Sequence, residues 1–461
     1  MKVLLVSANV TRSPYPVYPL GMSQVAAALH HAGHQVRQID LLQKGLNLDV
    51  VGQEAQSFAP GLIGISVRNI DNVNLLDEQR YINGVGELVR QVRQTTGAKI
   101  LLGGAGFSLM PERILEETGG DYGIVGEGDI AAVGFVKDVK RGVWPASRLI
   151  RAVERVESGR IGSALYDEEI LAFYRCHGNI VPVQTKRGCS CRCAYCTYPI
   201  LEGSNLRLRD PKAVVDDIEF LARGQGSRYL YFVDSVFNDD EGAYLEVVAE
   251  MERRSLSVPW TGLFRPGGMT DALIERMKKT GFVAAEVGAD AACDATLRGL
   301  GKSFTFRDVQ ESHKLFIRHG IVTSYFFMFG GPGETPETVL QGIRNIGGLH
   351  DSVAVISMGI RILPGTLLAR RAIAEGLIAP TNDLFEPVYY LSPTVDRGWL
   401  ERTLIEAFAG APRCVFPPNA LDASVAKLHM MGYTGPLGDV LLRYAKPRDR
   451  QGLGSEVPVD L

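Results

Sequence analysis

The chain has 461 residues, of which 46% are hydrophobic, and its formal net charge is -3. This length predicts two or three domains, and the composition is ordinary for a globular protein with large cores. The small net charge speaks against a nucleic-acid surface, and no apolar run approaches the ~20 residues that a membrane-spanning helix needs. The first residues resemble a short strand and lack the cleavage site of a signal peptide, so we expect a cytoplasmic protein.

Short apolar runs alternate with helical patterns over the first 140 residues. Strands are expected at 2–7, 35–40, 62–67, 99–104 and 121–129, and helices at 21–33 and about 77–92. Two of the runs are apolar throughout, as in parallel strands that are buried on both faces. The alternation predicts an α/β fold with a doubly wound, Rossmann-like parallel sheet over residues 1–140. A mixed, charged linker is expected at 141–180.

A second alternating series begins at Val181. Strands are expected at 181–188, 229–234, 260–264, 282–290, 321–331 and 353–362, with helical patterns between them. Such a series predicts a partial (β/α)6 barrel of the TIM type over residues 181–370. The region 371–461 is expected to be small, mostly helical and to shape the active site. Its aromatic residues are candidates for the pocket lining, although a place in the core is the more common role: Tyr389, Tyr390, Trp399 and Phe416.

Four of the seven cysteines lie between positions 189 and 196. This clustering favours metal chemistry in a reducing compartment over a disulfide framework. Cys189, Cys193 and Cys196 can hold three irons of a 4Fe-4S cluster and leave the fourth iron open, as in a catalytic site. The alternative is a zinc site, for which Cys191, Cys176 or His177 could supply the fourth ligand. The position at the end of the first barrel strand favours catalysis.

The spacing Cys189-x-x-x-Cys193-x-x-Cys196, with Tyr195 before the last cysteine, resembles the signature of the radical S-adenosylmethionine (SAM) superfamily. The resemblance covers about residues 181–370 and implies that SAM chelates the open iron and receives one electron from the cluster. It also implies SAM contacts at the ends of later strands. These residues are Tyr195, Asp234, Ser235, Glu286, Asp290, Gly330, Gly331 and Ile362.

Three of these residues are acidic: Asp234, Glu286 and Asp290. Asp234 could accept a hydrogen bond from the SAM ammonium group. At the fourth strand the family often has a Glu-Ser pair, whereas this chain has Asp290-Ala291. An acidic residue at a strand end is also commonly a helix cap or a solvated group.

The N-terminal domain resembles the cobalamin-binding domains that precede such barrels. In sheets of this kind, ligands bind beyond the carboxyl ends of the strands. The resemblance implies cobalamin contacts from Gly21, Ser66, Val67, Arg68, Asn69, Gly103, Gly104, Gly106, Glu127 and Gly128. The alternatives are a domain without a cofactor or one that binds a nucleotide, although the GxGxxG fingerprint is missing after the first strand.

The Asp-x-His-x-x-Gly motif, whose histidine ligates cobalt in many cobalamin proteins, is absent. The segment 67–72 resembles the tryptophan-methylating branch of the family, which implies that Arg68 faces the lower side of the cobalt. A guanidinium group cannot donate a lone pair, so it would discourage a sixth cobalt ligand. The alternatives are a solvated arginine or one that is paired with Asp71.

These resemblances imply a cobalamin-dependent radical SAM methyltransferase whose cofactors are a 4Fe-4S cluster, SAM and cobalamin. The methyl group would pass from SAM via methylcobalamin to a carbon of a small-molecule or peptide natural-product substrate, by a radical or a polar route. The same cofactors also serve cyclases, ring-rearranging enzymes and oxidative enzymes; a further alternative is a non-enzymatic electron carrier or cobalamin sensor. We expect a monomer that takes electrons from a flavodoxin- or ferredoxin-type donor, does not bind nucleic acid and has no membrane span.

Overall fold

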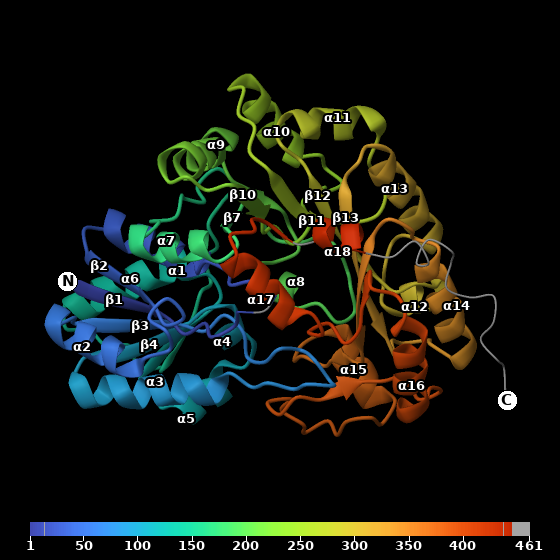
Figure 1. Cartoon of the computed structure of the whole chain (residues 1–461). Helices are drawn as coiled ribbons and strands as arrows, with labels where there is room; N and C mark the ends of the chain where they lie inside the picture. Colours follow the sequence, from blue (N-terminus) through green and yellow to red (C-terminus); the bar gives the residue numbers. More distant parts are fainter. Residues whose placement is uncertain (13, 437, 445–461) are drawn as a thin grey trace.

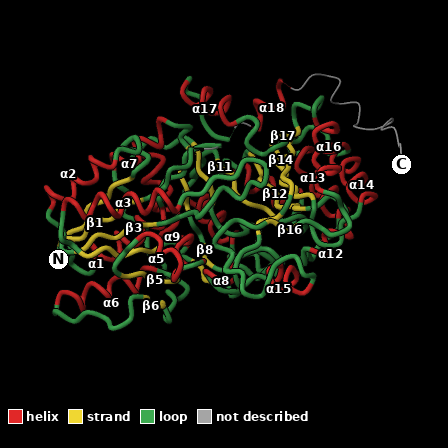
Figure 2. Tube along the Cα trace, turned by 90° about the horizontal axis from the view of Figure 1, so that it is seen from below, coloured by secondary structure: helices red, strands yellow, loops and turns green. Residues whose placement is uncertain are grey.

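The computed structural model describes residues 1–12, 14–436 and 438–444. Two α/β units lie side by side, the N-terminal one on the left of Figure 1 and the barrel on the right. Figure 2 shows their strands as two separate groups with helices outside them. Within the described ranges, no helix is long and apolar enough to cross a membrane.

The N-terminal unit is a six-stranded parallel sheet in the order β2-β1-β3-β4-β5-β6. Its strands are β1 (Lys2–Ser7), β2 (Gln35–Asp40), β3 (Leu62–Ser66), β4 (Lys99–Gly103), β5 (Tyr122–Val125) and β6 (Leu149–Arg151). Its helices are α1 (Leu20–His31), α2 (Leu48–Phe58), α3 (Ile82–Thr95), α4 (Ala105–Leu109), α5 (Pro111–Thr118) and α6 (Gly128–Lys140). The predicted doubly wound fold is confirmed, and all five expected strands are present.

The segment expected to be a linker, 141–180, contains regular structure. The strand β6 extends the first sheet by pairing with β5, so this unit continues past residue 140 to Arg151. Helix α7 (Glu168–Cys176) follows and leads into the barrel. A three-residue strand is too short to show a period in the sequence, which is why the pattern did not predict it.

The barrel unit is a seven-stranded parallel sheet in the order β17-β14-β13-β12-β11-β10-β7. Its strands are β7 (Ile180–Val183), β10 (Tyr229–Phe232), β11 (Trp260–Phe264), β12 (Ala284–Asp290), β13 (Val322–Phe329), β14 (Val353–Met358) and β17 (Cys414–Val415). The helices between them are α9 (Pro211–Glu219) with its π-helical continuation (Phe220–Gly224), α10 (Tyr244–Arg253), α11 (Asp271–Lys279), α12 (Asp294–Gly299), α13 (Phe306–Arg318), α14 (Pro336–Gly347) and α15 (Leu367–Ala374). The six expected strands are all present.

The C-terminal region contributes more than helices. Strand β17 adds to β14, and a two-stranded antiparallel sheet joins β15 (Ile360–Arg361) to β16 (Tyr389–Tyr390). The helices of this region are α16 (Arg397–Phe408), α17 (Asp422–Met430) and α18 (Gly438–Tyr444). Helix α18 packs on β13 and β14, with Gly438 against Val322 and Ser324. Of the aromatic candidates, Tyr390 is fully buried and donates its hydroxyl to Glu375, as a core residue does.

The inner face of the barrel is accessible. Along β13 the side chains alternate between partly exposed and buried, beginning with a partly exposed Val322. The buried set faces the helices, since Tyr325 packs on His313 of α13 and Phe329 lies against Gly342 of α14. The partly exposed set therefore faces inward. Helix α18 covers part of this inner face, against Val322 and Ser324, and the rest of the face stays partly exposed.

Candidate cofactor sites at the domain interface

The cysteine loop leaves the barrel through a short strand, β8 (Lys186–Arg187), and ends in helix α8 (Tyr198–Leu201); β8 pairs with β9 (Arg207–Leu208). Buried Asp234 holds the entry to this loop. Its carboxylate accepts hydrogen bonds from the Thr185 amide (2.8 Å), the Thr185 hydroxyl (2.6 Å) and the Lys186 amide (3.2 Å). Asp234 thus positions the chain that leads to the cysteines, and its expected contact with SAM stays a prediction.

Glycine is required directly before the first cysteine. Gly188 has a φ of 93°, and a Cβ atom there would collide with the carbonyl oxygen of Asn205. Its amide donates to Glu202 (2.9 Å), and the Cys189 amide donates to Gly203 (3.0 Å). The backbone at Cys189 is therefore held on both sides.

The three predicted cluster ligands lie within electrostatic reach of one another. Burial raises the pKa of the Cys193 thiol, and it raises the pKa of Cys196 to about 11. Thiolates at these positions need nearby positive charge, which the irons of a cluster supply. The Cys191 thiol is hydrogen-bonded to Cys189, and this contact lowers the pKa of Cys189 and raises that of Cys191.

A single-ion site is not present in the described part of the chain, where no three His, Cys, Asp or Glu side chains are arranged to hold one metal ion. The candidates for a fourth zinc ligand lie at the end of α7. Cys176 is exposed, and the His177 ring is bonded to the Phe173 carbonyl (2.7 Å). In a 4Fe-4S cluster each thiolate binds a different iron, so the thiol arrangement fits a cluster.

A lysine that the sequence analysis did not single out connects the cysteine loop to β12. The Lys302 ammonium group contacts the Cys193 sulfur (3.1 Å) and forms a buried ion pair with Asp290. The Tyr195 hydroxyl also donates to Asp290 (2.6 Å). Asp290 is thus engaged by the loop, and its expected place beside the SAM ribose stays a prediction. Nothing in the local sequence marks Lys302, because its partners are 12 and 109 residues away.

The remaining predicted SAM residues differ in availability. The buried Ser235 hydroxyl has no hydrogen-bond partner among the described residues, so it is available for a hydrogen bond to a ligand. The amides of Gly330 and Gly331 both donate to Glu334. Ile362 is fully buried, and its amide donates to Val388 (2.8 Å). Roles for these residues in SAM binding remain predictions.

Glu286 is an acidic group on the inner face of the barrel. It accepts hydrogen bonds from Tyr231 (2.7 Å) on the neighbouring part of the sheet and from Tyr15, which belongs to the N-terminal domain. Burial raises the pKa of Glu286 to about 7, although both hydrogen bonds oppose this shift. The group can therefore gain or lose a proton near neutral pH.

Two adjoining cavities, of about 370 Å³ and about 620 Å³, lie at the carboxyl edge of the first sheet. Nine of the ten residues predicted to contact cobalamin line them: Gly21, Ser66, Arg68, Asn69, Gly103, Gly104, Gly106, Glu127 and Gly128. The tenth, Val67, is buried. Gly104 has a φ of 103°, and a Cβ atom there would lie 2.5 Å from the Val67 carbonyl oxygen, so glycine lets the two loops meet.

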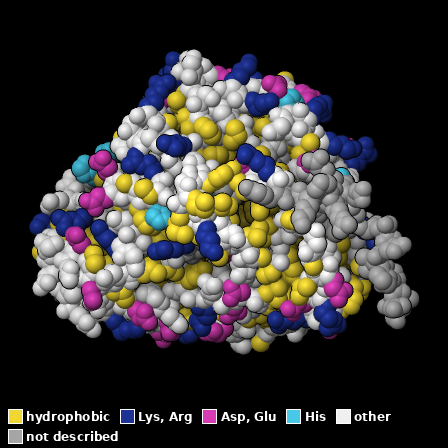
Figure 3. Space-filling model, in the orientation of Figure 1, with side chains coloured by type: hydrophobic (Ala, Val, Ile, Leu, Met, Phe, Trp, Pro, Cys, Tyr) yellow, Lys and Arg dark blue, Asp and Glu magenta, His cyan; other side chains and the backbone are white. Residues whose placement is uncertain are grey.

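The smaller cavity continues as an apolar slot between the first sheet and helices α1 and α6, lined among others by Leu5, Val25, Leu101 and Val136. Residues that follow barrel strands line its other side, including Gln184 and Val233. On the outer face in Figure 3, hydrophobic side chains gather where the two halves of the molecule meet. A mostly apolar cavity with a few polar groups fits a large organic cofactor.

Arg68 lines both cavities and is exposed to them. Within the described ranges, its guanidinium group forms no hydrogen bond and no ion pair. Asp71, the alternative partner from the sequence, is paired instead with Arg361 (2.9 Å). Among the described residues, Arg68 is therefore a cation without an ion-pair partner at the wall of the proposed cobalamin site.

Two family models match the chain. The B12 binding domain matches residues 6–136, and the radical SAM superfamily matches residues 183–345. The fold, the cysteine loop and these matches together define the class: the chain joins a B12 binding domain to a radical SAM domain.

Two of the similar curated proteins are named methyltransferases. Tryptophan 2-C-methyltransferase of Streptomyces laurentii is 26% identical over 435 residues, which cover 77% of this chain and 72% of that protein. Cytidylyl-2-hydroxyethylphosphonate methyltransferase of Streptomyces wedmorensis is 23% identical and covers 84% of both chains. Among solved structures, the radical SAM methyltransferase TsrM of Kitasatospora setae, with tryptophan and a SAM analog bound, has a TM-score of 0.85 at 22% identity and covers 96% of this chain and 97% of its own. The cobalamin-dependent enzyme OxsB has a TM-score of 0.70 at 14% identity, covering 96% of this chain and 72% of its own.

Removal of any one predicted cluster ligand should prevent cluster assembly. We expect Cys189→Ala, Cys193→Ala and Cys196→Ala each to lose most of the iron and acid-labile sulfide after anaerobic reconstitution, because each thiolate holds one iron. Cys191→Ala, the matched control in the same loop, should retain both. Chemical iron and sulfide analysis with visible absorption measures this. Wild-type protein that holds zinc, or that lacks sulfide, would contradict the assignment.

The stability of the protein should depend on Glu286 in a defined pH window. Because the folded-state pKa of about 7 lies above the ordinary glutamate value, the stabilising contribution is complete at low pH and is lost as pH rises from about 4 through about 7. Relative to Glu286→Gln, the wild type should lose at most about 1.4 kcal/mol of unfolding free energy per pH unit there. Urea unfolding at several pH values measures the difference, with the surface substitution Glu116→Gln as control. Glu334, whose pKa burial also raises to about 7, is common to both proteins and cancels. A difference that is constant across this range would refute the assignment.

Proposed function

We propose that this enzyme transfers a methyl group from SAM, by way of cobalamin, to a carbon atom of a small-molecule or peptide substrate. The observation that carries the proposal is helix α8. It begins two residues after Cys196, and its residues Tyr198 and Leu201 line both cavities. Tyr198 is deep in the molecule yet 45% exposed, because it faces this space. The helix that follows the last predicted cluster ligand and the predicted cobalamin residues therefore border the same two cavities, as exchange between SAM and cobalamin would require.

When bound, the cobalamin supplies a cobalt atom that carries a methyl group, and the cluster supplies an iron that binds SAM and, on a radical route, an electron that cleaves it. The chain holds these groups and keeps water out. Over the larger cavity, Asn419 of the C-terminal region bonds to Asn74 (3.1 Å) and Asp77 (2.6 Å) of the loop after β3. This contact ties the C-terminal region to the wall of the larger cavity, which supports its proposed role in shaping the active site.

Arg68 favours the polar variant of this reaction. A cation that has no ion-pair partner and cannot donate a lone pair would leave the lower side of the cobalt without a protein ligand. A methylated cofactor held in this way would release its methyl group more easily, and in the polar variant the methyl group would reach the substrate without hydrogen abstraction. Support for this variant comes from the position of Arg68 at the wall of both cavities.

The relatives suggest which substrate to test first. One is named for methylation of tryptophan, and the TsrM structure contains tryptophan, so we infer an indole compound as the first candidate. Ring formation is the second candidate outcome, but the anaerobic magnesium-protoporphyrin IX monomethyl ester cyclase of Rubrivivax gelatinosus matches only 33% of this chain. A flavodoxin- or ferredoxin-type donor, a monomeric state and a cytoplasmic location remain predictions.

Methyl transfer can be tested directly. Anaerobically reconstituted enzyme with hydroxocobalamin, reductant and methyl-labelled SAM should convert L-tryptophan, or another candidate substrate, to a labelled product that has gained one CH2. On the polar route this product forms without stoichiometric 5′-deoxyadenosine; on the radical route the two appear together. Mass spectrometry and chromatography measure both. A product without the CH2 gain would favour ring formation or oxidation, and no product or 5′-deoxyadenosine with any candidate would refute the proposal.

Substitution of Arg68 tests the polar route. Histidine in its place can ligate cobalt, so Arg68→His should slow methyl transfer at least about tenfold, or about 1.4 kcal/mol, and alter the visible spectrum of bound cobalamin. Arg68→Lys retains the charge without a fork of donors and should remain closer to the wild type. If Arg68→His left both the rate and the spectrum unchanged, Arg68 would not face the cobalt.

A further inference from the structure

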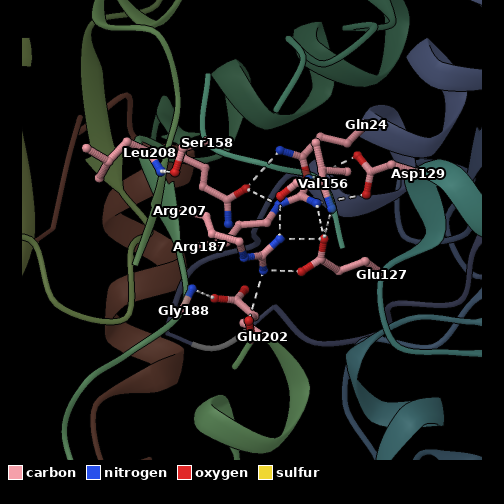
Figure 4. Close-up of polar contacts among 11 residues, drawn as sticks. Gln24, Glu127, Asp129, Val156, Ser158, Arg187, Gly188, Glu202, Arg207 and Leu208 are labelled. Atoms are coloured by element: carbon pink, nitrogen blue, oxygen red, sulfur yellow. Dashed lines mark hydrogen bonds and ion pairs between the residues drawn. The ribbon is translucent and has the colours of Figure 1, made fainter. Parts of the chain in front are cut away.

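Four charged side chains from both domains form a buried cluster beside the smaller cavity (Figure 4). We name it the interdomain cluster: Glu127 and Asp129 of the N-terminal domain, with Arg187 and Arg207 of the barrel. The Arg187 side chain is 5% exposed and that of Glu127 is 9% exposed. Such groups are costly to bury unless they are fully paired.

Arg187 is at the centre of this cluster and uses all its donor groups. It donates two parallel hydrogen bonds to the Asp129 carboxylate (2.8 and 3.1 Å) and one to Glu127 (3.2 Å). The remaining bonds go to the side chains of Gln24 and Gln184 (both 3.2 Å). Burial alone would lower the pKa of Arg187, but the two carboxylates outweigh this and raise it. The guanidinium is therefore fixed in one geometry.

Glu127 is shared between the two arginines. Arg207 contacts both of its carboxylate oxygens, and the Val156 amide donates to it as well (3.3 Å). Glu127 is the residue before helix α6, yet its side chain makes no capping hydrogen bond to that helix. The carboxylate is turned instead toward the barrel. Its role is thus defined by the contact between the domains.

The cluster lies between the two proposed cofactor sites. On one side, Gln24, Glu127 and Asp129 line the smaller cavity, as does Arg187 itself. On the other side, Arg187 is two residues before Cys189, and Gly188 between them is held by Glu202. A shift of the cavity wall at Glu127 or Asp129 must therefore move Arg187 and, with it, the first cluster ligand.

Stability alone does not account for this arrangement. A buried ion pair is often no more stabilising than apolar residues of the same volume. The domains are also joined by a second buried pair, Arg361 with Asp71, whose side chains are each 2% exposed. That pair connects the loop after β3 to β15 and is not adjacent in sequence to the cysteines.

We propose that Arg187 is a positioning residue that couples cobalamin binding in the N-terminal domain to the orientation of the cysteine loop, and so to SAM binding at the cluster. The inference rests on the proposed cofactors. Coupling between two binding sites is reciprocal, so each ligand must change the affinity of the other by the same factor. Because the mechanism runs through a fixed side chain, substitution of that side chain should abolish the factor without removing either site.

The experiment measures the SAM dissociation constant of cluster-loaded protein with and without hydroxocobalamin. Mössbauer spectra of iron-labelled protein report SAM at the cluster, and visible absorption reports bound cobalamin. The variants are Arg187→Met, Arg187→Lys and the double variant Arg187→Met/Asp129→Asn. The second substitution in the double variant removes the carboxylate charge that loses its partner when Arg187 is replaced. The matched control is Arg361→Met/Asp71→Asn, which removes the other buried interdomain pair. Iron and sulfide content confirm that each variant holds a cluster.

In the wild type, cobalamin should tighten SAM binding at least about fivefold, the lower end of typical coupling. The factor should fall to about one in Arg187→Met and should stay there in the double variant, even where the double variant recovers thermal stability. Arg187→Lys should retain part of it, since lysine keeps the charge but not the two-pronged contact. The control should keep the wild-type factor.

Three results would overturn the inference: a wild-type factor of one, a double variant that regains the coupling, or a control that loses it equally. None of these readouts requires methyl transfer. A wild type that binds neither cobalamin nor SAM would instead overturn both the proposed function and the coupling, so the two failures can be told apart.

Discussion

The geometry of this enzyme depends on one constraint, which is that two parallel sheets present their carboxyl ends to the same space. Residues after β1, β3 and β4 line the cavities from one side, and residues after β7 and β10 line them from the other. Parallel strands place their following loops at one edge, so each sheet delivers its polar and glycine-rich segments together. Helix α8, which follows the cysteine loop, borders both cavities.

Buried charges hold the two edges at a fixed separation. The interdomain cluster lies beside the cysteine loop, and the Arg361–Asp71 pair lies near β15. Unlike apolar packing, which tolerates small slips, a two-pronged arginine–carboxylate contact has a defined distance and direction. Chemistry between two cofactors depends on their relative placement to within a fraction of an ångström. The free-energy cost of burying these charges is thus better explained by the orientation that they impose on the two sheets than by a gain in stability.

Much of the fold could be predicted from the sequence, because the strands are apolar runs bounded by glycine and polar turns. All eleven expected strands are present, whereas β6 and β17, with three and two residues, are too short to show any pattern. For the site, glycines such as Gly104 were informative since a close backbone approach leaves few other residues possible. Acidic residues were less so. Asp234 and Asp290 are at the expected strand ends. Their partners, Thr185 and Lys302, come close only in the folded chain, so the position of an acidic residue at a strand end does not reveal its partner.

The charge at the wall of the proposed cobalamin site follows from the same interface. Arg68 and Asp71 are three residues apart, and by sequence alone they are natural partners. In the folded chain Asp71 is committed to Arg361, which also donates to the carbonyl groups of Ile362 and Leu384. An arginine with these additional partners competes better for the carboxylate than an exposed one does, because a buried carboxylate is stabilised most by a cation that is itself buried and fixed. Within the part of the chain that the structure describes, docking of the domains therefore leaves Arg68 at the cavity wall without a carboxylate partner. On this argument, the polar route of methyl transfer would depend on both domains, because Arg361 of the barrel pairs with Asp71, the carboxylate that would otherwise be available to Arg68.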